Sequence, residues 1–114
     1  MSITVAGKEL IADRLTMTPV SAQPLWIAIG TGSPSATALG SEISRKYCKI
    51  VSSSGGIITY SCLWDIEDNI EGLVTEIGIF NQATLGGTML ASATTSKNKS
   101  KSDSLEITWQ IEIL

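Results

Sequence analysis

The stretch EGLVTEIGIFNQATLGGTMLASATT, residues 71–95, decides the fold that we predict for this chain. Side chains in its first part alternate between two faces, which is the period of a β-strand. One face takes Leu73, Thr75, Ile77 and Ile79, and the other takes Val74, Glu76, Gly78 and Phe80. Residues 81–87 then supply polar side chains and a Gly-Gly pair that allows the backbone to reverse. Residues 88–95 return as a second strand, so we expect a two-stranded unit at the centre of the fold.

Other segments also have the pattern of strands. Residues 24–30 alternate, and residues 46–52 and 56–64 predict a hairpin that turns through residues 53–56. Residues 57–64 are apolar on both faces, as is typical of a central strand. Residues 104–114 alternate most regularly of all. Their inward side chains are Leu105, Ile107, Trp109, Ile111 and Ile113, and their outward side chains are Glu106, Thr108, Gln110 and Glu112.

The N-terminal segments complete the expected architecture. Residues 2–6 form either a short strand or an extended arm, and residues 7–15 predict a short helix with Leu10, Ile11 and Leu15 on one side. Residues 16–23 read as a connector, and residues 41–45 as one helical turn capped by Ser41. We therefore predict one all-β domain over residues 1–114, an antiparallel β-sandwich or jelly-roll-like barrel of six or seven strands with one short N-terminal helix.

Composition narrows the classes of function. The chain has 114 residues, of which 43% are hydrophobic and only 17% charged, so we expect part of its apolar surface to meet other subunits. The net charge of −3 argues against nucleic acid and anionic membrane as partners. The absence of histidine removes the commonest general base and metal ligand. We expect neither catalytic residues nor a cofactor.

Two segments have compositions that suggest ligand binding, but specific positions in each do not match the known binding motifs. Residues 30–40, GTGSPSATALG, lack the third glycine of a dinucleotide-binding loop, since Ser35 stands in its place, and no Gly-Lys-Ser/Thr follows. We predict a long inter-strand loop there. Residues 65–72 form an acidic turn, but Ile70 occupies the glycine position of a calcium loop. We predict a solvated turn and no metal site.

We predict that the cysteines, lysines and tryptophans have structural roles. Cys48 and Cys62 lie in the two arms of the predicted hairpin, where a disulfide is conceivable, and we predict buried, unreactive thiols instead. The basic run of residues 96–103, with Lys97, Lys99 and Lys101, predicts a solvated loop. Contact with an acidic protein surface and protection of a sheet edge remain alternatives. The tryptophans are expected in the core. They are Trp26, Trp64 and Trp109.

Several segments, taken in order, resemble a known family. They are GKELIADRL, WIAIGTG with a Ser/Pro/Ala/Thr loop, ALGSEISRK, EGLVTEIGIFN, GGTMLASAT and SKNKSKSDSLEITWQIEI. This order is similar to that of the small β-domains of tailed-bacteriophage virion proteins. Such domains occur at the head-binding end of tail fibres, in baseplate components and as capsid decoration (cement) proteins. The resemblance covers nearly the whole chain.

The resemblance implies a non-enzymatic virion protein, made in the host cytoplasm, that forms a homo-oligomer, with a trimer favoured. Its partners would be the major capsid protein or tail proteins. We expect a stand-alone domain without the shaft and receptor-binding tip of a tail fibre, which favours a decoration protein over a small tail-fibre or baseplate adaptor. A carbohydrate- or receptor-binding β-sandwich is a further alternative. The expected contacts are the N-terminal arm, the 30–40 loop and the basic run. Their residues are Ile3, Val5, Ser33, Pro34, Lys97, Lys99 and Lys101.

Glu76 is the acidic residue that the strand pattern singles out. It shares the predicted face of Val74 and Phe80, where a carboxylate needs a partner. The sequence therefore predicts either a paired, buried carboxylate or a contact between subunits.

Overall fold

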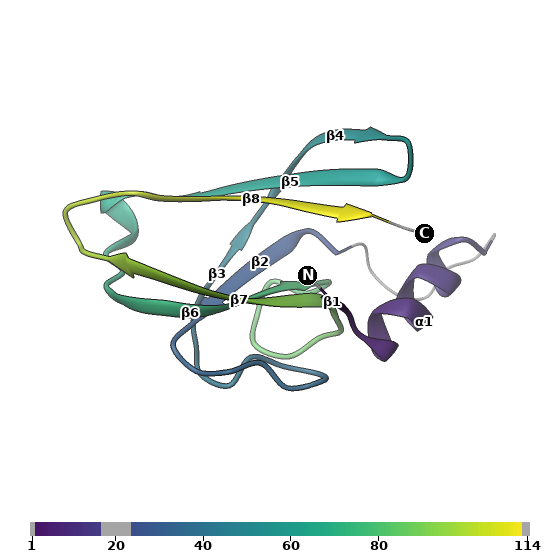
Figure 1. The fold of residues 1–114 in the computed structure, drawn as a ribbon, viewed down its shortest axis with the longest axis horizontal. Coiled ribbons are helices and arrows are strands. Elements are labelled where there is room, and N and C mark those ends of the chain that lie inside the picture. Colours follow the sequence, from purple (N-terminus) through teal and green to yellow (C-terminus); the bar gives the residue numbers. More distant parts are fainter. Residues whose placement is uncertain (1, 17–23, 113–114) are drawn as a thin grey trace.

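The structure, a computed structural model, describes residues 2–16 and 24–112 and folds them into two packed antiparallel β-sheets with one helix (Figure 1). The five-stranded sheet has the order β1 (Ser2–Ile3), β7 (Met89–Lys99), β6 (Gly72–Phe80), β2 (Trp26–Gly30) and β3 (Glu42–Tyr47). The three-stranded sheet has the order β4 (Lys49–Ser54), β5 (Ile57–Trp64) and β8 (Leu105–Glu112). This confirms the predicted β-sandwich with a short N-terminal helix, and the described residues contain eight strands where six or seven were expected.

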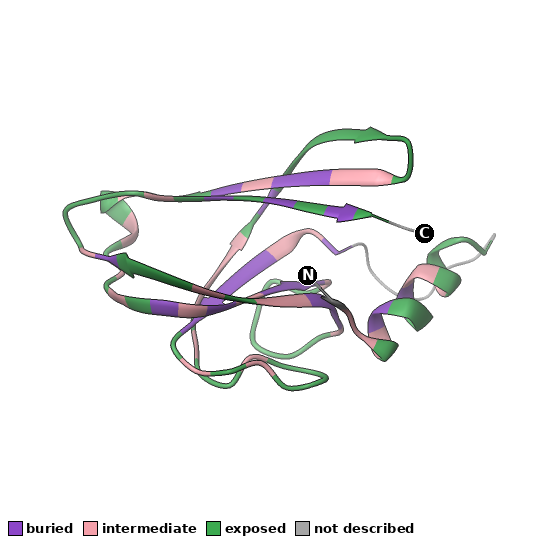
Figure 2. Ribbon diagram, viewed as in Figure 1, coloured by how far each residue is buried: buried purple, intermediate pink, exposed green. Residues whose placement is uncertain are grey.

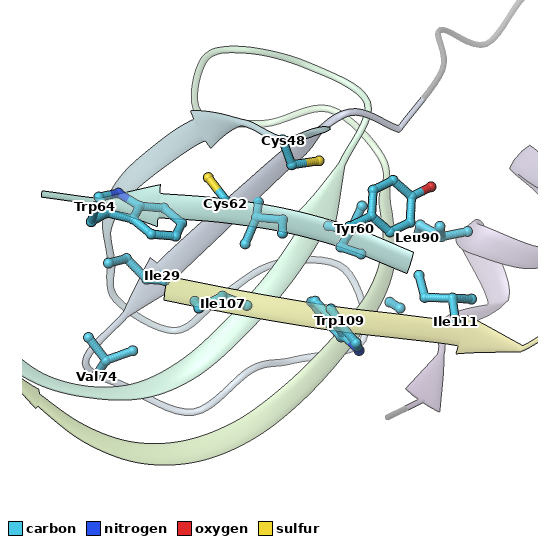
Figure 3. Packing of buried hydrophobic residues seen from close by; sticks show 13 residues of the cluster. Ile29, Cys48, Tyr60, Cys62, Trp64, Val74, Leu90, Ile107, Trp109 and Ile111 are labelled. Carbon is cyan, nitrogen blue, oxygen red and sulfur yellow. The ribbon is translucent and has the colours of Figure 1, made fainter. Parts of the chain in front are cut away.

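The core fills the space between the two sheets (Figures 2 and 3). Strand β5 is the central strand of its sheet, as predicted, and its register places Tyr60 opposite Trp109 and Cys62 opposite Ile107. The five-stranded sheet contributes Ile27, Ile29 and other apolar side chains from its inner face. Burying these side chains is the main force that holds the sheets together.

The unit at the centre of the five-stranded sheet is confirmed, with one correction to its faces. Strands β6 and β7 pair over most of their length, but their register shifts between Val74 and Glu76. As a result Val74 lies in the core between the sheets together with Ile79, whereas Phe80 lies in a separate cluster. The strict alternation that placed Val74 on the face of Phe80 was therefore wrong at this irregularity.

Strands β3 and β4 form one run of chain that changes sheets at Cys48. The hairpin of β4 and β5 turns where predicted, but Lys46 and Tyr47 belong to β3 and pair with β2 in the other sheet. The helical turn predicted for residues 41–45 was wrong, because the segment from Glu42 onward pairs with β2 as a strand, with a register shift between Ile29 and Gly30. Tertiary pairing here overrides a weak local capping signal.

The N-terminus is a short edge strand followed by helix α1 (Val5–Arg14). Ser2 and Ile3 pair with β7, so this part of the predicted arm is a strand, and Thr4 caps the helix by accepting a hydrogen bond from the Gly7 amide at 2.8 Å. Gly7 lets the helix touch the sheet, because an added Cβ would clash with the carbonyl oxygen of Leu90. Leu15 is exposed rather than on a buried helix face. The predicted connector falls mainly on residues 17–23, outside the described part of the chain.

Candidate functional site

The outer face of the five-stranded sheet, which points away from the other sheet, is covered by two loops (Figure 1). The 31–41 loop joins β2 to β3, and the 81–88 loop joins β6 to β7. Each loop is bound to the sheet through one buried charged residue. Glu76 on β6 holds the first loop and Arg45 on β3 holds the second.

Glu76 is fully buried, and its carboxylate accepts three hydrogen bonds from backbone amides of the 31–41 loop. Oε2 accepts from Gly32 at 2.9 Å and from Ser41 at 2.7 Å, and Oε1 accepts from Gly40 at 2.6 Å. Charge-assisted hydrogen bonds of this kind are about twice as strong as neutral ones. Glu76 is thus a buried carboxylate, as one of the two predictions held, and its hydrogen-bond partners among the described residues are backbone amides rather than a cationic side chain.

Small residues make this arrangement possible. A Cβ on Gly30 would clash with the Glu76 carboxylate, and one on Gly40 would lie 2.5 Å from the carbonyl oxygen of Ser33. Thr75 adds a hydrogen bond from its hydroxyl to the Gly32 carbonyl at 2.6 Å. The segment 30–40, predicted as an inter-strand loop, is therefore a loop whose amides converge on a carboxylate of the protein itself.

Arg45 holds the 81–88 loop by donating hydrogen bonds to its backbone carbonyls, whereas Glu76 accepts hydrogen bonds from backbone amides. Its Nη1 donates to the carbonyl oxygens of Gln82, Thr84 and Gly86 at 2.9, 2.6 and 2.9 Å. Its Nε and Nη2 donate to the Glu42 carboxylate at 2.9 and 2.8 Å. The guanidinium carbon lies 3.8 Å from the centroid of the Phe80 ring, within the range of a cation–π contact.

Leu39 anchors the 31–41 loop through an apolar contact. Its side chain packs against a small buried cluster of Ala28, Phe80 and Met89 on this face. A Cβ on Gly78 would lie 3.2 Å from the Leu39 side chain, so the glycine allows this close approach. The 31–41 loop consequently rests on a second, smaller core.

The tips of both loops remain exposed above this base. The 31–41 loop presents Ser33, Ser35 and Thr37, and the 81–88 loop presents Gln82 and Leu85. The Leu85 side chain is 80% exposed, an apolar residue among polar ones. We call these exposed residues the loop-tip surface. Because the loop backbones are already ordered, binding a partner here loses little conformational entropy.

The residues predicted as partner contacts do not form one surface. Ser33 is exposed and Pro34 half-buried in the 31–41 loop, and Val5 is exposed at the start of α1. Ile3 is half-buried and packs against the core from β1. Lys97 lies exposed on β7 and Lys101 lies exposed in the turn after it; these two sit on the opposite end of β7 from the loop-tip surface.

Lys99 corrects the prediction of a solvated basic loop. Its side chain is fully buried, and its ammonium donates to the carbonyl oxygens of Ser100 at 2.6 Å, Asp103 at 2.7 Å and Ile70 at 3.3 Å. It thereby holds two turns together and is not available to a partner. The strand continues through Lys99, whose ammonium binds carbonyl oxygens of the adjacent turns, which the alternation of lysine with Ser and Asn does not reveal.

The two cysteines are free, buried thiols that belong to the core. Burial, with a smaller effect from the other thiol, raises the pKa of Cys48 to about 12. Burial also raises the pKa of Cys62 to about 11. Both thiols are therefore protonated at neutral pH, which suppresses their nucleophilicity. The prediction of buried cysteines is confirmed.

The acidic turn contains a short 3-10 helix, Ile66–Asp68, that Asp65 caps. Lys46 donates to the Asp68 carboxylate at 2.7 Å and to the Leu63 carbonyl at 2.8 Å. This hydrogen bond holds the pKa of Asp68 below its usual value and raises that of Lys46. The ion pair ties β3 to the far end of β5, so part of the predicted acidic turn is structural.

Two of the three tryptophans are buried in the core. Trp64 is fully buried and its ring nitrogen donates to the Ser44 hydroxyl at 2.9 Å, and Trp109 packs beside β5. Trp26 is half-buried on the outer face of β2, where its ring meets the exposed ring of Tyr47 edge to face at 5.8 Å between centroids. The core prediction therefore holds for two rings and fails for Trp26.

Sequence reasoning missed Arg45 and Glu42, the pair that fixes the second loop. A strand assignment for residues 42–47 would have placed Arg45 beside β2 and prompted a search for its partners. Within residues 2–16 and 24–112, no group of three or more potential metal ligands occurs. The same residues include no helix that is long and apolar enough to span a membrane.

Comparison of the chain with protein-family models, with curated proteins and with solved structures finds no match.

Proposed function

We propose that this chain is a non-enzymatic structural protein of a bacteriophage virion, most specifically a capsid decoration protein that binds and stabilises the assembled head. The observation that carries the proposal is the loop-tip surface, held in place by the six backbone hydrogen bonds of Glu76 and Arg45. Ordered, exposed loops on a rigid β-sandwich are a common way to build a protein-binding surface. The family resemblance of the sequence supplies the class of partner.

The proposed mechanism is mass action. A ligand that binds the assembled shell, but not its separate subunits, stabilises the shell by RT ln(1 + [L]/Kd) at each site. Many copies on one particle add these contributions. Leu85 is the expected apolar anchor of each contact, because its side chain is 80% exposed in a loop whose backbone is already fixed.

Co-sedimentation with isolated particles tests this proposal. We would mix the purified protein with DNA-free heads and, separately, with tails assembled from proteins encoded in the same genome. We expect saturable binding to heads and a loss of at least tenfold in affinity for Leu85→Arg. Leu15→Arg is the matched control, because Leu15 is similarly exposed (83%) but lies at the end of α1. Binding to tails alone favours a tail-fibre or baseplate adaptor, and binding to neither particle contradicts both.

A carbohydrate-binding function is the second candidate, and the exposed ring of Tyr47, which packs against the half-buried ring of Trp26, favours it. Tyr47 is 65% exposed, and its edge-to-face contact fixes its orientation. Aromatic rings on a β-sheet surface can stack against the apolar faces of sugars. Saturable binding on a glycan array that Tyr47→Ala abolishes would support this function over the virion proposal. Failure of every glycan to bind would exclude it.

A further inference from the structure

Strand β8 has an exposed edge that plays no part in the proposed loop-tip surface. It forms one edge of the three-stranded sheet, and among the described residues only β5 pairs with it. All eight of its residues, Leu105–Glu112, pair with β5 without a shift in register. Among residues 2–16 and 24–112, no strand pairs with the other side of β8, so its backbone there presents a regular row of donors and acceptors that is a template for another strand.

The other edges of the two sheets carry features that oppose strand addition. Strand β4 bears Lys49 and a register shift between Ile50 and Ser52. Strand β3 bears Arg45 and Lys46, and β1 is only two residues long. Lysines, irregular strands and very short strands are the usual protection of a sheet edge. Strand β8 has no lysine, proline or register shift, so it is the unprotected edge of the described chain.

The sequence of β8 is complementary to itself. In an antiparallel pair of two copies with a two-fold axis at Thr108, directly opposite residues have numbers that add to 216. Leu105 then faces Ile111 of the second copy, and Ile107 faces its Trp109, all on the inner face. On the outer face Glu106 faces Gln110 and Thr108 faces Thr108, so no two carboxylates are directly opposite. Threonine pairs and apolar pairs of this kind stabilise neighbouring strands.

The structure also leaves space for this contact. A cleft of about 200 Å³ lies between β6, β7 and β8, and its apolar lining includes Val74, Ile77, Leu105 and Ile107. In the register centred on Thr108, Ile111 and Trp109 of the second copy come next to Leu105 and Ile107. The mouth of this cleft would then be covered by apolar side chains.

We propose that two copies of this chain associate through antiparallel pairing of their β8 strands, with the two-fold axis at Thr108, to form a continuous six-stranded sheet. Such an interface is isologous, because the same strand serves both partners. It is distinct from the loop-tip surface and does not depend on the proposed virion function. A closed trimer contains no two-fold axis, so this contact would join two monomers into a dimer or two trimers into a hexamer.

Sedimentation velocity over a range of protein concentrations tests the association. We expect a dimer or hexamer for the wild type and a shift to half that mass for Thr108→Lys, since two ammonium groups would meet at the axis. Thr37→Lys adds the same charge at an exposed loop position and should leave the mass unchanged. A wild-type monomer or trimer would overturn the proposal, as would an equal effect of both variants.

Disulfide cross-linking tests the register. Directly opposite residues have Cα atoms about 4.5–5.5 Å apart, within disulfide range, so Thr108→Cys should form a covalent dimer rapidly on mild oxidation. Gln110→Cys is the matched control, because its two copies would be separated by roughly 14 Å along the strands. A mixture of Glu106→Cys and Gln110→Cys chains should cross-link as well as Thr108→Cys. If Gln110→Cys cross-links alone as fast as Thr108→Cys, the register is wrong.

Discussion

The 31–41 and 81–88 loops cover the same sheet face but are held by residues of opposite charge. Glu76 accepts three backbone amides of the first loop, and Arg45 donates to three backbone carbonyls of the second. Both loops also have local hydrogen bonds: Asn81 accepts from the Thr88 amide at 2.7 Å in the second loop, and the Ser35 amide donates to the Ala38 carbonyl at 2.8 Å in the first. The two anchors differ in burial, because the Glu76 side chain is fully buried, whereas Arg45 binds carbonyls of exposed residues. Loss of the Glu76 hydrogen bonds should therefore cost more stability than loss of those of Arg45.

Replacing Glu76 should have the largest effect. In Glu76→Gln the side chain keeps one oxygen but turns an NH₂ group toward amides that also donate, so buried amides lose their acceptor. We expect the free energy of unfolding to fall by about 2–4 kcal/mol, measured by urea denaturation. Hydrogen exchange of the Gly32, Gly40 and Ser41 amides should quicken in the same variant.

Glu71→Gln is the matched control for this prediction. Glu71 is exposed just before β6 and undergoes the same chemical change. Substitutions at such surface positions usually change stability by less than about 0.5 kcal/mol. Equal stabilities of the two variants would mean that the Glu76 hydrogen bonds do not hold the 31–41 loop.

Replacing Arg45 should have a smaller effect, because the carbonyls of the 81–88 loop that it binds belong to exposed residues, where water can replace a lost hydrogen bond. In Arg45→Lys the charge remains, but one ammonium cannot serve both the Glu42 carboxylate and three separate carbonyls. We expect a loss of about 1–2 kcal/mol in the free energy of unfolding. Heteronuclear NMR should show increased motion in the 81–88 loop and little change in the 31–41 loop.

Arg14→Lys, at the other arginine of the chain, is the control for Arg45→Lys. Arg14 lies exposed in the last turn of α1, where lysine keeps the positive charge at the C-terminal end of the helix, so this replacement should lower stability less than Arg45→Lys does. A mobile 31–41 loop in Arg45→Lys would show that the two loops form one cooperative unit through Leu39. That result would remove the distinction between them.

The alternation of side chains in the sequence was sufficient to predict the β-sandwich, but not the structure of its loops. Strand β8, and strand β6 from Glu76 onward, follow the alternation of their own side chains, and that local period survives folding. The pattern failed at Val74 and at residues 41–45, where the partner strand decides the register or the element. Strand pairing is a long-range property, so a single segment does not encode it.

The partners of the buried charged residues Glu76 and Lys99 are also long-range or backbone groups that the sequence alone does not predict. The sequence singled out Glu76 because a carboxylate in an alternating strand needs a partner, but it did not show that the partners are amides more than 30 positions away. Lys99 was misplaced because its acceptors are carbonyl oxygens of neighbouring turns. Every residue type carries a backbone carbonyl, and every type except proline carries a backbone N–H, so no pattern of residue types identifies these groups as partners.

Disrupting the ion pair of Lys46 and Asp68 should change stability less than replacing Glu76 or Arg45. Both side chains are partly exposed, and the hydrogen bond from Lys46 lowers the pKa of Asp68 from its usual value of 3.8. The unfolded chain therefore takes up a proton on Asp68 at a higher pH than the folded chain does. The stabilisation is present above pH 3.8 and is lost as the pH falls through the lowered value.

Asp68→Asn should flatten the dependence of Tm on pH between 5 and 2, because the asparagine oxygen can still accept from the Asp65 amide but does not titrate. Glu67→Gln, an exposed neighbour, should leave that dependence nearly as in the wild type. Salt should reduce the difference between wild type and Asp68→Asn, since exposed ion pairs are screened. Insensitivity to salt would place this pair with the buried charges that hold the loops.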